Sequence, residues 1–184
     1  MDIKLKDLIN GKKSVILEKW FDAIIETYPT DTTGFLKKKQ DQFANPVGHT
    51  ISKGIEDILE VLLGEKELPE DFPFLNDIIR VRAIQDFTPS KAMTFIFLLK
   101  KVVREALEKE IRQNQIYDAL LRFESKIDDL ALFAFNIYVK CREQLYELKT
   151  DELKRMTYTL LKKANLMYEI PAPEFPVKDQ ECNT

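Results

Sequence analysis

The sequence predicts an all-α fold, a helical bundle with a long helix towards its C-terminus. Apolar residues recur at steps of three and four over most of the 184 residues, which is the period of one helix face. The chain has only five glycines, few for an architecture of strands and turns. Hydrophobic residues make up 45% of it, enough for the core of one ordinary domain. We therefore expect a single helical domain over residues 1–168 and a flexible, proline-containing tail over 169–184.

The first half of the chain predicts three helices. A short opening helix ends near Gly11, and a second helix covers 13–28 and stops before a proline, because the residue before proline disfavours helical angles. Residues 29–46 are expected to be mostly loop. The third helix covers 47–63, and Gly64 after it is expected to cap the helix because glycine adopts positive φ without strain.

The second half predicts longer helices. One covers 74–86, and the next covers 89–112 with Thr88 as its N-cap. The first part of this second helix is apolar nearly all round, which places it at the centre of the bundle. A last helix covers 116–148, and the polar pair at 150–151 leaves open whether it continues further.

The helix at 116–148 is also expected to join two copies of the chain. Its apolar stripe advances by alternating steps of four and three residues, as in a coiled coil. At about 1.5 Å per residue the helix would be about 50 Å long, more than a small domain needs. We therefore expect a homodimer. The interface candidates are Leu120, Phe123, Ile127, Leu130 and Ile137.

Two blocks place polar and turn-forming residues inside this apolar helical sequence. Arg82 falls on the apolar side of the predicted 74–86 helix and can pair with Asp86, because a buried guanidinium requires a compensating partner. Such a pair would lock the helix onto its neighbours. Alternatively, Arg80 or Arg82 grips a small anionic or polar ligand. The residues of this predicted polar network or ligand site are Arg80, Arg82, Gln85, Asp86, Asn45 and His49.

The sequence offers little for catalysis or cofactor binding. His49 is the only histidine, and we expect it to have a local packing or hydrogen-bonding role; the alternative is a haem ligand, for which no second ligand is evident. Neither Cys141 nor Cys182 has the spacing to His49 that a metal site needs. No HExxH, GxSxG or P-loop motif occurs. We expect no cofactor, no metal and no enzymatic activity.

Charge and cysteine content bear on the partners and the compartment. The chain has 28 basic and 31 acidic residues, and its net charge of −3 gives no drive towards nucleic acid or anionic lipid. No segment is long and apolar enough to span a membrane, and the N-terminus has no signal core. The two cysteines lie in very different settings, so we expect no disulfide and a cytoplasmic location.

The two polar blocks also carry a resemblance to a known family. They read Phe-Ala-Asn-Pro-Val-Gly at 43–48 and Arg-Val-Arg-Ala-Ile-Gln-Asp-Phe-Thr-Pro-Ser at 80–90. Within the stretch from Trp20 to Arg104, the chain resembles the N-terminal regulatory domain of RsbT co-antagonist proteins of the RsbRD type.

The resemblance implies a signal-input module of a bacterial stress response. In such co-antagonists the helical domain precedes a STAS domain, and the assembly, a stressosome, sequesters the switch kinase RsbT. Related input domains are globin-like without haem and form dimers. This sequence ends at Thr184 without a STAS phosphoacceptor motif, so phosphorylation by the kinase is not carried over. The expectation is a stand-alone input domain that acts through an unidentified regulatory protein.

Overall fold

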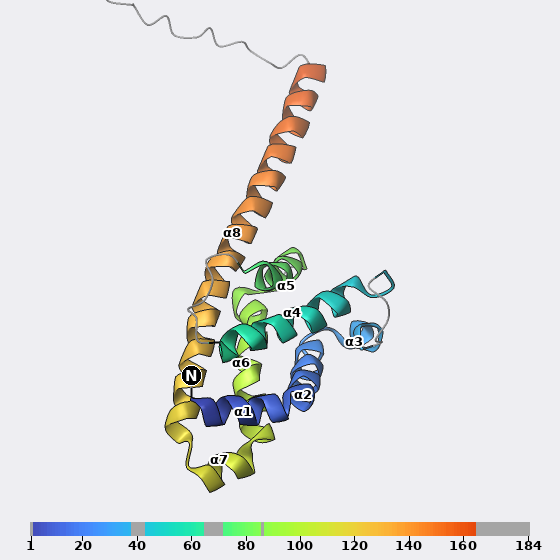
Figure 1. Ribbon diagram of the computed structural model, residues 1–184. Helices are drawn as coiled ribbons and strands as arrows, with labels where there is room; N and C mark the ends of the chain where they lie inside the picture. Colours follow the sequence, from blue (N-terminus) through green and yellow to red (C-terminus); the bar gives the residue numbers. More distant parts are fainter. Residues whose placement is uncertain (1, 38–42, 65–71, 86, 165–184) are drawn as a thin grey trace, which may run out of the picture. The chain divides into compact units, whose positions relative to one another are not determined.

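In the computed structural model, the described part of the chain consists of helices and the irregular segments that connect them. The described residues are 2–37, 43–64, 72–85 and 87–164. They contain eight helices and no strand, which confirms the all-α helical bundle (Figure 1). None of the described helices combines the length and the apolarity needed to cross a membrane.

The helices follow one another with short connections. In chain order they are α1 (Ile3–Gly11), α2 (Lys13–Ile25), α3 (Thr30–Leu36), α4 (Pro46–Leu63), α5 (Pro73–Ile84), α6 (Pro89–Ala106), α7 (Glu108–Asn114) and α8 (Tyr117–Lys163). The chain divides into two units, Met1–Leu145 and Tyr146–Thr184, and α8 contributes residues to both. The tail expected over 169–184 lies outside the described residues, so the predicted domain boundary stays a prediction.

The core of the first unit forms where α2 packs on α4 and α6, and where α4 packs on α5. Trp20 of α2 is fully buried, and its Nε1 donates to the Phe95 carbonyl of α6 at 2.7 Å. Helices α4 and α5 come close together at Gly54, where an added Cβ would lie 2.6 Å from Ile78 Cδ1. Phe95, Ile96 and Leu99 of α6 are buried, whereas Phe97 is 45% exposed, so this helix is not enclosed on all sides as its apolar first part predicted.

Several predicted boundaries in the first half are wrong. Helix α2 ends at Ile25 instead of 28, and Thr30–Leu36, expected to be mostly loop, forms α3. Gly64 does cap α4, but its φ is −68°, so the position does not use the positive φ that glycine allows. A Cβ there would instead lie 3.1 Å from the Val61 carbonyl oxygen.

The predicted helix over 89–112 is two helices, because the chain bends at Leu107. Leu107 has φ −111° and is fully buried, and Lys12 Nζ donates to the preceding carbonyl, that of Ala106, at 2.7 Å. Further on, α8 continues through the polar pair at 150–151 to Lys163. The question of one helix or two is therefore settled in favour of one over the described residues.

Candidate functional site

The most unusual residue of the core is Arg82, whose side chain is fully buried. It lies on α5 beside the buried residues Leu75, Ile78, Ile79 and Ala83. The three- and four-residue spacing of α5 therefore places a cation on the face that packs against the core.

The Arg82 guanidinium is held by neutral groups. Nη1 donates to the Lys91 carbonyl of α6 at 3.0 Å, and Nη2 donates to Thr27 Oγ1, just after α2, at 3.0 Å. Its Cζ lies over the rings of Phe87, Phe95 and Tyr28, at 4.9, 5.1 and 5.3 Å from their centroids. Cation–π attraction is strongest in such a desolvated setting. Arg82 thus ties the end of α2 to the start of α6.

The expected partner of Arg82 was a carboxylate, and among the described residues none lies within ion-pair distance. The predicted partner, Asp86, lies outside the described residues. Nε of Arg82 is buried and makes no hydrogen bond with a described group. Burial lowers the pKa of Arg82, and the neighbouring Tyr28 opposes that shift. The core therefore holds a cation whose charge is only partly compensated.

Tyr28 shares this environment. Its hydroxyl is buried and has no hydrogen-bond partner among the described residues. Burial raises the pKa of the Tyr28 phenol, and the Arg82 charge lowers it by a smaller amount. The ring meets Phe87 edge to face, with centroids 5.1 Å apart. In the sequence Tyr28 was only the last residue of the helix predicted over 13–28, so its polar role was missed.

The turn that joins α5 to α6 is also held from α8. Tyr138 donates its hydroxyl proton to the Phe87 carbonyl at 2.5 Å, and Arg142 Nη1 donates to the Ala83 carbonyl at 3.1 Å. Both donors lie in the first unit. The turn is therefore bound on one side by Arg82 and on the other by α8.

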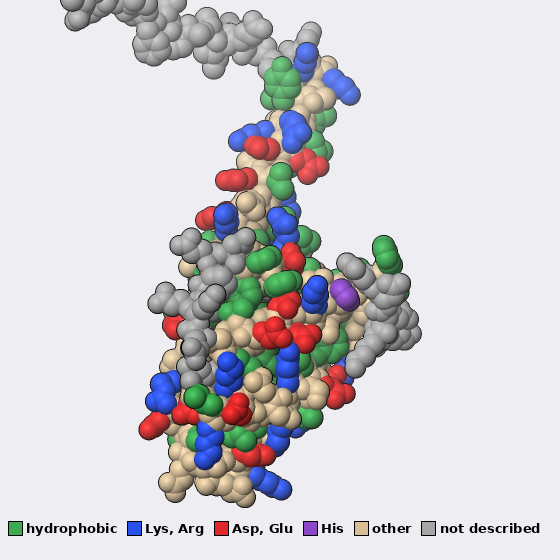
Figure 2. Space-filling view, in the orientation of Figure 1, with side chains coloured by type: hydrophobic (Ala, Val, Ile, Leu, Met, Phe, Trp, Pro, Cys, Tyr) green, Lys and Arg blue, Asp and Glu red, His purple; other side chains and the backbone are tan. Residues whose placement is uncertain are grey.

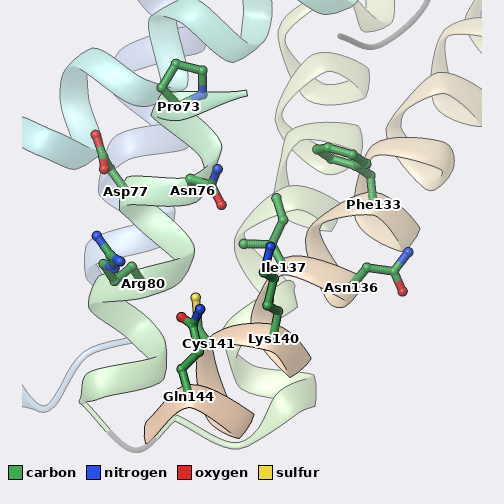
Figure 3. Close-up of a pocket in the computed structure, with 10 residues that line it drawn as sticks. All are labelled: Pro73, Asn76, Asp77, Arg80, Phe133, Asn136, Ile137, Lys140, Cys141 and Gln144. Atoms are coloured by element: carbon green, nitrogen blue, oxygen red, sulfur yellow. The ribbon is translucent and has the colours of Figure 1, made fainter. Parts of the chain in front are cut away.

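Arg80 lies in a different place from Arg82. It is exposed and lines a groove of about 700 Å³ between α5 and α8 (Figure 3). Figure 3 shows Asn76 and Asp77 on the α5 side of the groove and Cys141 on the α8 side. Arg80 thus faces a groove, whereas Arg82 faces the core, although the sequence analysis grouped the two in one site.

Gln85 and the residues around it line a third environment. Gln85 is exposed at the C-terminal end of α5 and borders a cavity of about 560 Å³ with Tyr28, Thr88 and Lys91. This cavity lies next to the residues that hold Arg82. Within the predicted network, Gln85 thus lies near Arg82, whereas Arg80 lines a different groove.

Asn45 and His49 lie elsewhere again, at the start of α4. The Asn45 Oδ1 accepts from the Gly48 amide at 2.9 Å and so caps α4, and its Nδ2 donates to the Leu36 carbonyl at 2.9 Å. Gly48 is needed there because a Cβ would lie 2.3 Å from Asn45 Nδ2. His49 is exposed, and Figure 2 shows it in purple on the surface. Both residues line a cavity of about 520 Å³ between α2 and α4.

The predicted dimer interface is largely buried within the chain itself. Leu120, Phe123, Ile127 and Leu130 belong to the core of the first unit, and Ile137 is half-buried against it. The exposed apolar residues of α8 are others. In the second unit they are Tyr146, Leu148, Leu153, Met156, Tyr158, Leu160 and Leu161.

Arg82 and Tyr28 are two buried titratable groups of the described core with shifted pKa values. No three His, Cys, Asp or Glu side chains gather into a possible metal site within the described residues. Arg82 and Tyr28 are both shielded from solvent, and both shifts favour their neutral forms. Such groups can respond to a charge placed beside them.

Comparison with known protein families gives a match over most of the chain. The pattern of the family described as "RsbT co-antagonist protein rsbRD N-terminal domain" matches residues 14–153. Neither the curated proteins nor the solved structures contain a match to the chain.

Proposed function

Since the chain belongs to the RsbT co-antagonist protein rsbRD N-terminal domain family, whose members are regulatory domains, we propose that it is a non-catalytic signal-input domain. In this proposal it acts by binding other protein chains, first a second copy of itself and then a regulatory partner. Family membership supports the regulatory role, and the surface of α8 supports the mode of action.

The observation that carries the binding proposal is an exposed apolar stripe in the second unit. Tyr146, Leu153 and Leu160 are spaced seven residues apart, and Met156 stands between the last two at the step of three. All four are more than half exposed, Leu153 by 63% and Leu160 by 64%. A seven-residue apolar repeat is the pattern of a helix covered by another helix in a coiled coil.

The stability of this stretch points the same way. Every described residue from 146 to 164 is exposed, so no burial in its own chain stabilises these turns. In proteins most helical stability comes from tertiary packing of an apolar face, which this stretch lacks within the described chain. A second copy that covers the stripe would supply the missing burial, at about 25 cal/mol per Å² of apolar surface.

The proposal is tested by the mass of the particle in solution. Sedimentation equilibrium of the whole chain at tens of micromolar should give a dimer. The double variant Leu153→Glu/Leu160→Glu should be monomeric, because it places charged side chains where the second copy covers the stripe. Leu148→Glu is the matched control: it is 65% exposed, and at 100° per residue it points about 140° away from Leu153 and about 120° away from Leu160. A monomeric wild type, or a double variant that still dimerises, contradicts the proposal.

A further inference from the structure

A second exposed apolar surface lies in the first unit, on α8. Leu132, Phe135 and Val139 are exposed there, Leu132 by 69%, although Ala134 and Tyr138 between them are buried in the core. The three exposed residues advance by steps of three and four, so they share one face of the helix. Single exposed apolar residues are common on protein surfaces, but a contiguous group of them marks an interaction site.

Helix α6 widens this surface. Phe97 of α6 is also exposed, and Lys100 Nζ lies 5.9 Å from the centroid of its ring. The same ammonium lies 2.6 Å from Asp128 Oδ1 on α8. Asp128 stands one turn before Leu132, so Phe97 and Leu132 flank the same ion pair. The exposed apolar surface of the first unit therefore extends from α8 onto α6.

The exposed residues of α8 in the first unit continue the seven-residue repeat of the second unit. Helix α8 is one helix over all of these positions. In a coiled coil two positions of each repeat face the partner helix. The first of these positions holds Leu132, Val139, Tyr146, Leu153 and Leu160, and the second holds Phe135, Arg142, Lys149, Met156 and Lys163. The first set is thus apolar throughout, whereas three cations interrupt the second.

These cations decide in which direction a second copy can run. In a parallel, in-register pair each residue faces its own counterpart, so Arg142, Lys149 and Lys163 would each meet the same charge on the other copy. Asp128, which comes one repeat before Phe135, would also meet itself. Like charges that face each other are destabilising and select against the pairing that contains them. The parallel pair is therefore the less stable one.

An antiparallel pair removes all of these like-charge contacts, because the first position of one helix then faces the second position of the other. One register pairs Leu132 with Lys163, Phe135 with Leu160, Val139 with Met156, Arg142 with Leu153, and Tyr146 with Lys149. Each cation in it lies against an aliphatic or aromatic side chain that its methylene stem can cover. The basic last turn of α8, which holds Lys162 and Lys163, also comes to lie beside Asp128 of the other copy.

We propose that two copies of the chain pair antiparallel along α8, so that the second-unit stripe of one copy covers Leu132, Phe135 and Val139 of the other. The inference rests on the proposed function and deepens it, because it names the surface that the second-unit stripe occupies. Each copy gives and receives the same contact, as two-fold symmetry requires. The two exposed apolar surfaces of α8 are thereby buried in a single interface.

The test is disulfide formation between full chains in which Cys141 and Cys182 are replaced by serine. Val139→Cys and Met156→Cys are made in this background as two separate proteins. Oxidation of their mixture should give a covalent dimer with one copy of each, because a disulfide needs Cα atoms within about 7 Å. Either protein alone should stay unlinked. Self-linking of each protein alone would show a parallel pair and overturn the inference.

Sedimentation equilibrium of the same proteins separates this inference from the proposed function. If the proteins are dimeric but neither the mixture nor the single proteins become cross-linked, the antiparallel pairing is refuted and the dimer proposal stands. If the unsubstituted chain is monomeric, both are refuted.

Glutamate substitutions localise the interface in the first unit. Leu132→Glu/Phe135→Glu should weaken dimerisation at least about tenfold. Leu121→Glu is the matched control, because Leu121 is 64% exposed and precedes Phe135 by two repeats, but its place in the register lies beyond Lys163, where α8 ends. This control should dimerise as the wild type does, whereas in a parallel pair it would face itself and weaken the dimer. Unchanged affinity in Leu132→Glu/Phe135→Glu would remove the first unit from the interface and refute the inference.

Discussion

At the scale of single residues, Arg82 shows how a buried charge can be retained without a salt bridge. A carbonyl, a hydroxyl and three aromatic rings surround its guanidinium. Each contact is modest, but together they tie the segment after α2, the end of α5 and the start of α6. The residue is therefore a structural connection as well as a charge.

We expect Arg82→Ala to lower the free energy of unfolding by about 3–5 kcal/mol, because it removes these contacts and leaves a large cavity. Arg80→Ala, on the exposed side of the same helix, should change it by no more than about 0.5 kcal/mol. Urea unfolding followed by the fluorescence of Trp20, the only tryptophan, measures both. If both substitutions lowered the free energy of unfolding equally, the burial of Arg82 would contribute nothing to stability.

Tyr28 predicts a dependence of stability on alkaline pH. Its pKa is raised in the folded state above the ordinary value of about 10, so above that pH the folded state retains a proton that the unfolded chain has lost. Its stabilising contribution is complete below about pH 10 and is lost as the pH rises through the folded-state pKa. Urea unfolding between pH 8 and 11 should therefore show a smaller loss of stability in Tyr28→Phe than in the wild type. Parallel curves for the two proteins would exclude Tyr28 as the source.

At the scale of elements, the contact of α4 with α5 depends on the missing side chain of Gly54. We expect Gly54→Ala to destabilise the protein by about 1–2 kcal/mol despite the better helix propensity of alanine, because its Cβ would meet Ile78 Cδ1 at 2.6 Å and the Phe74 carbonyl oxygen at 3.3 Å. Adding Ile78→Val removes the Cδ1 atom and should recover part of that loss in thermal unfolding.

Gly11→Ala is the matched control for this helix contact. A Cβ at Gly11 would meet nothing within 4 Å, so this substitution should be neutral or stabilise by up to about 1 kcal/mol. If Gly54→Ala behaves as Gly11→Ala does, the two helices have room to adjust and the close approach is not a constraint.

Helix periodicity predicted most elements, because a one-sided apolar stripe requires only local spacing. It gave α4 to within one residue at its start. It missed the bend at Leu107, because neither glycine nor proline interrupts the sequence there. The Ala106 carbonyl at this bend accepts a hydrogen bond from Lys12, which follows α1 and is far away in the sequence. It also could not distinguish a stripe covered by the chain's own core from one covered by a second copy. Leu120 and Phe123 follow the same pattern as Leu153 and Leu160, yet only the second pair is exposed.

The candidate site was predicted in its residue types more than in its geometry. A polar block at 80–90 in an apolar helical sequence marks the turn between α5 and α6, and Arg82 is buried there as its helical position indicated. Its surroundings come from α2 and α6, and the contributions of Thr27 and Tyr28 arise only through tertiary packing. No spacing in the sequence connects those residues, so no local pattern could reveal them.

At the scale of the whole molecule, the two units should differ in how they respond to protein concentration. The first unit has its own buried core, whereas the described part of the second has none. We expect amide hydrogen exchange over 146–163 to slow as the concentration rises from about 1 to 100 μM, while exchange in α4 stays constant, because only the former depends on association. Leu153→Glu/Leu160→Glu should abolish that difference. Exchange that is slow at every concentration would contradict it.

The buried cation of this fold is a guanidinium, and this determines how its charge depends on pH. A guanidinium keeps its proton throughout the range of acidity that living cells experience, whereas an imidazole would switch within it. The only imidazole of the chain stands on the surface of α4, away from the aromatic enclosure. The positive charge that Arg82 places inside the core therefore persists through fluctuations in acidity over that range.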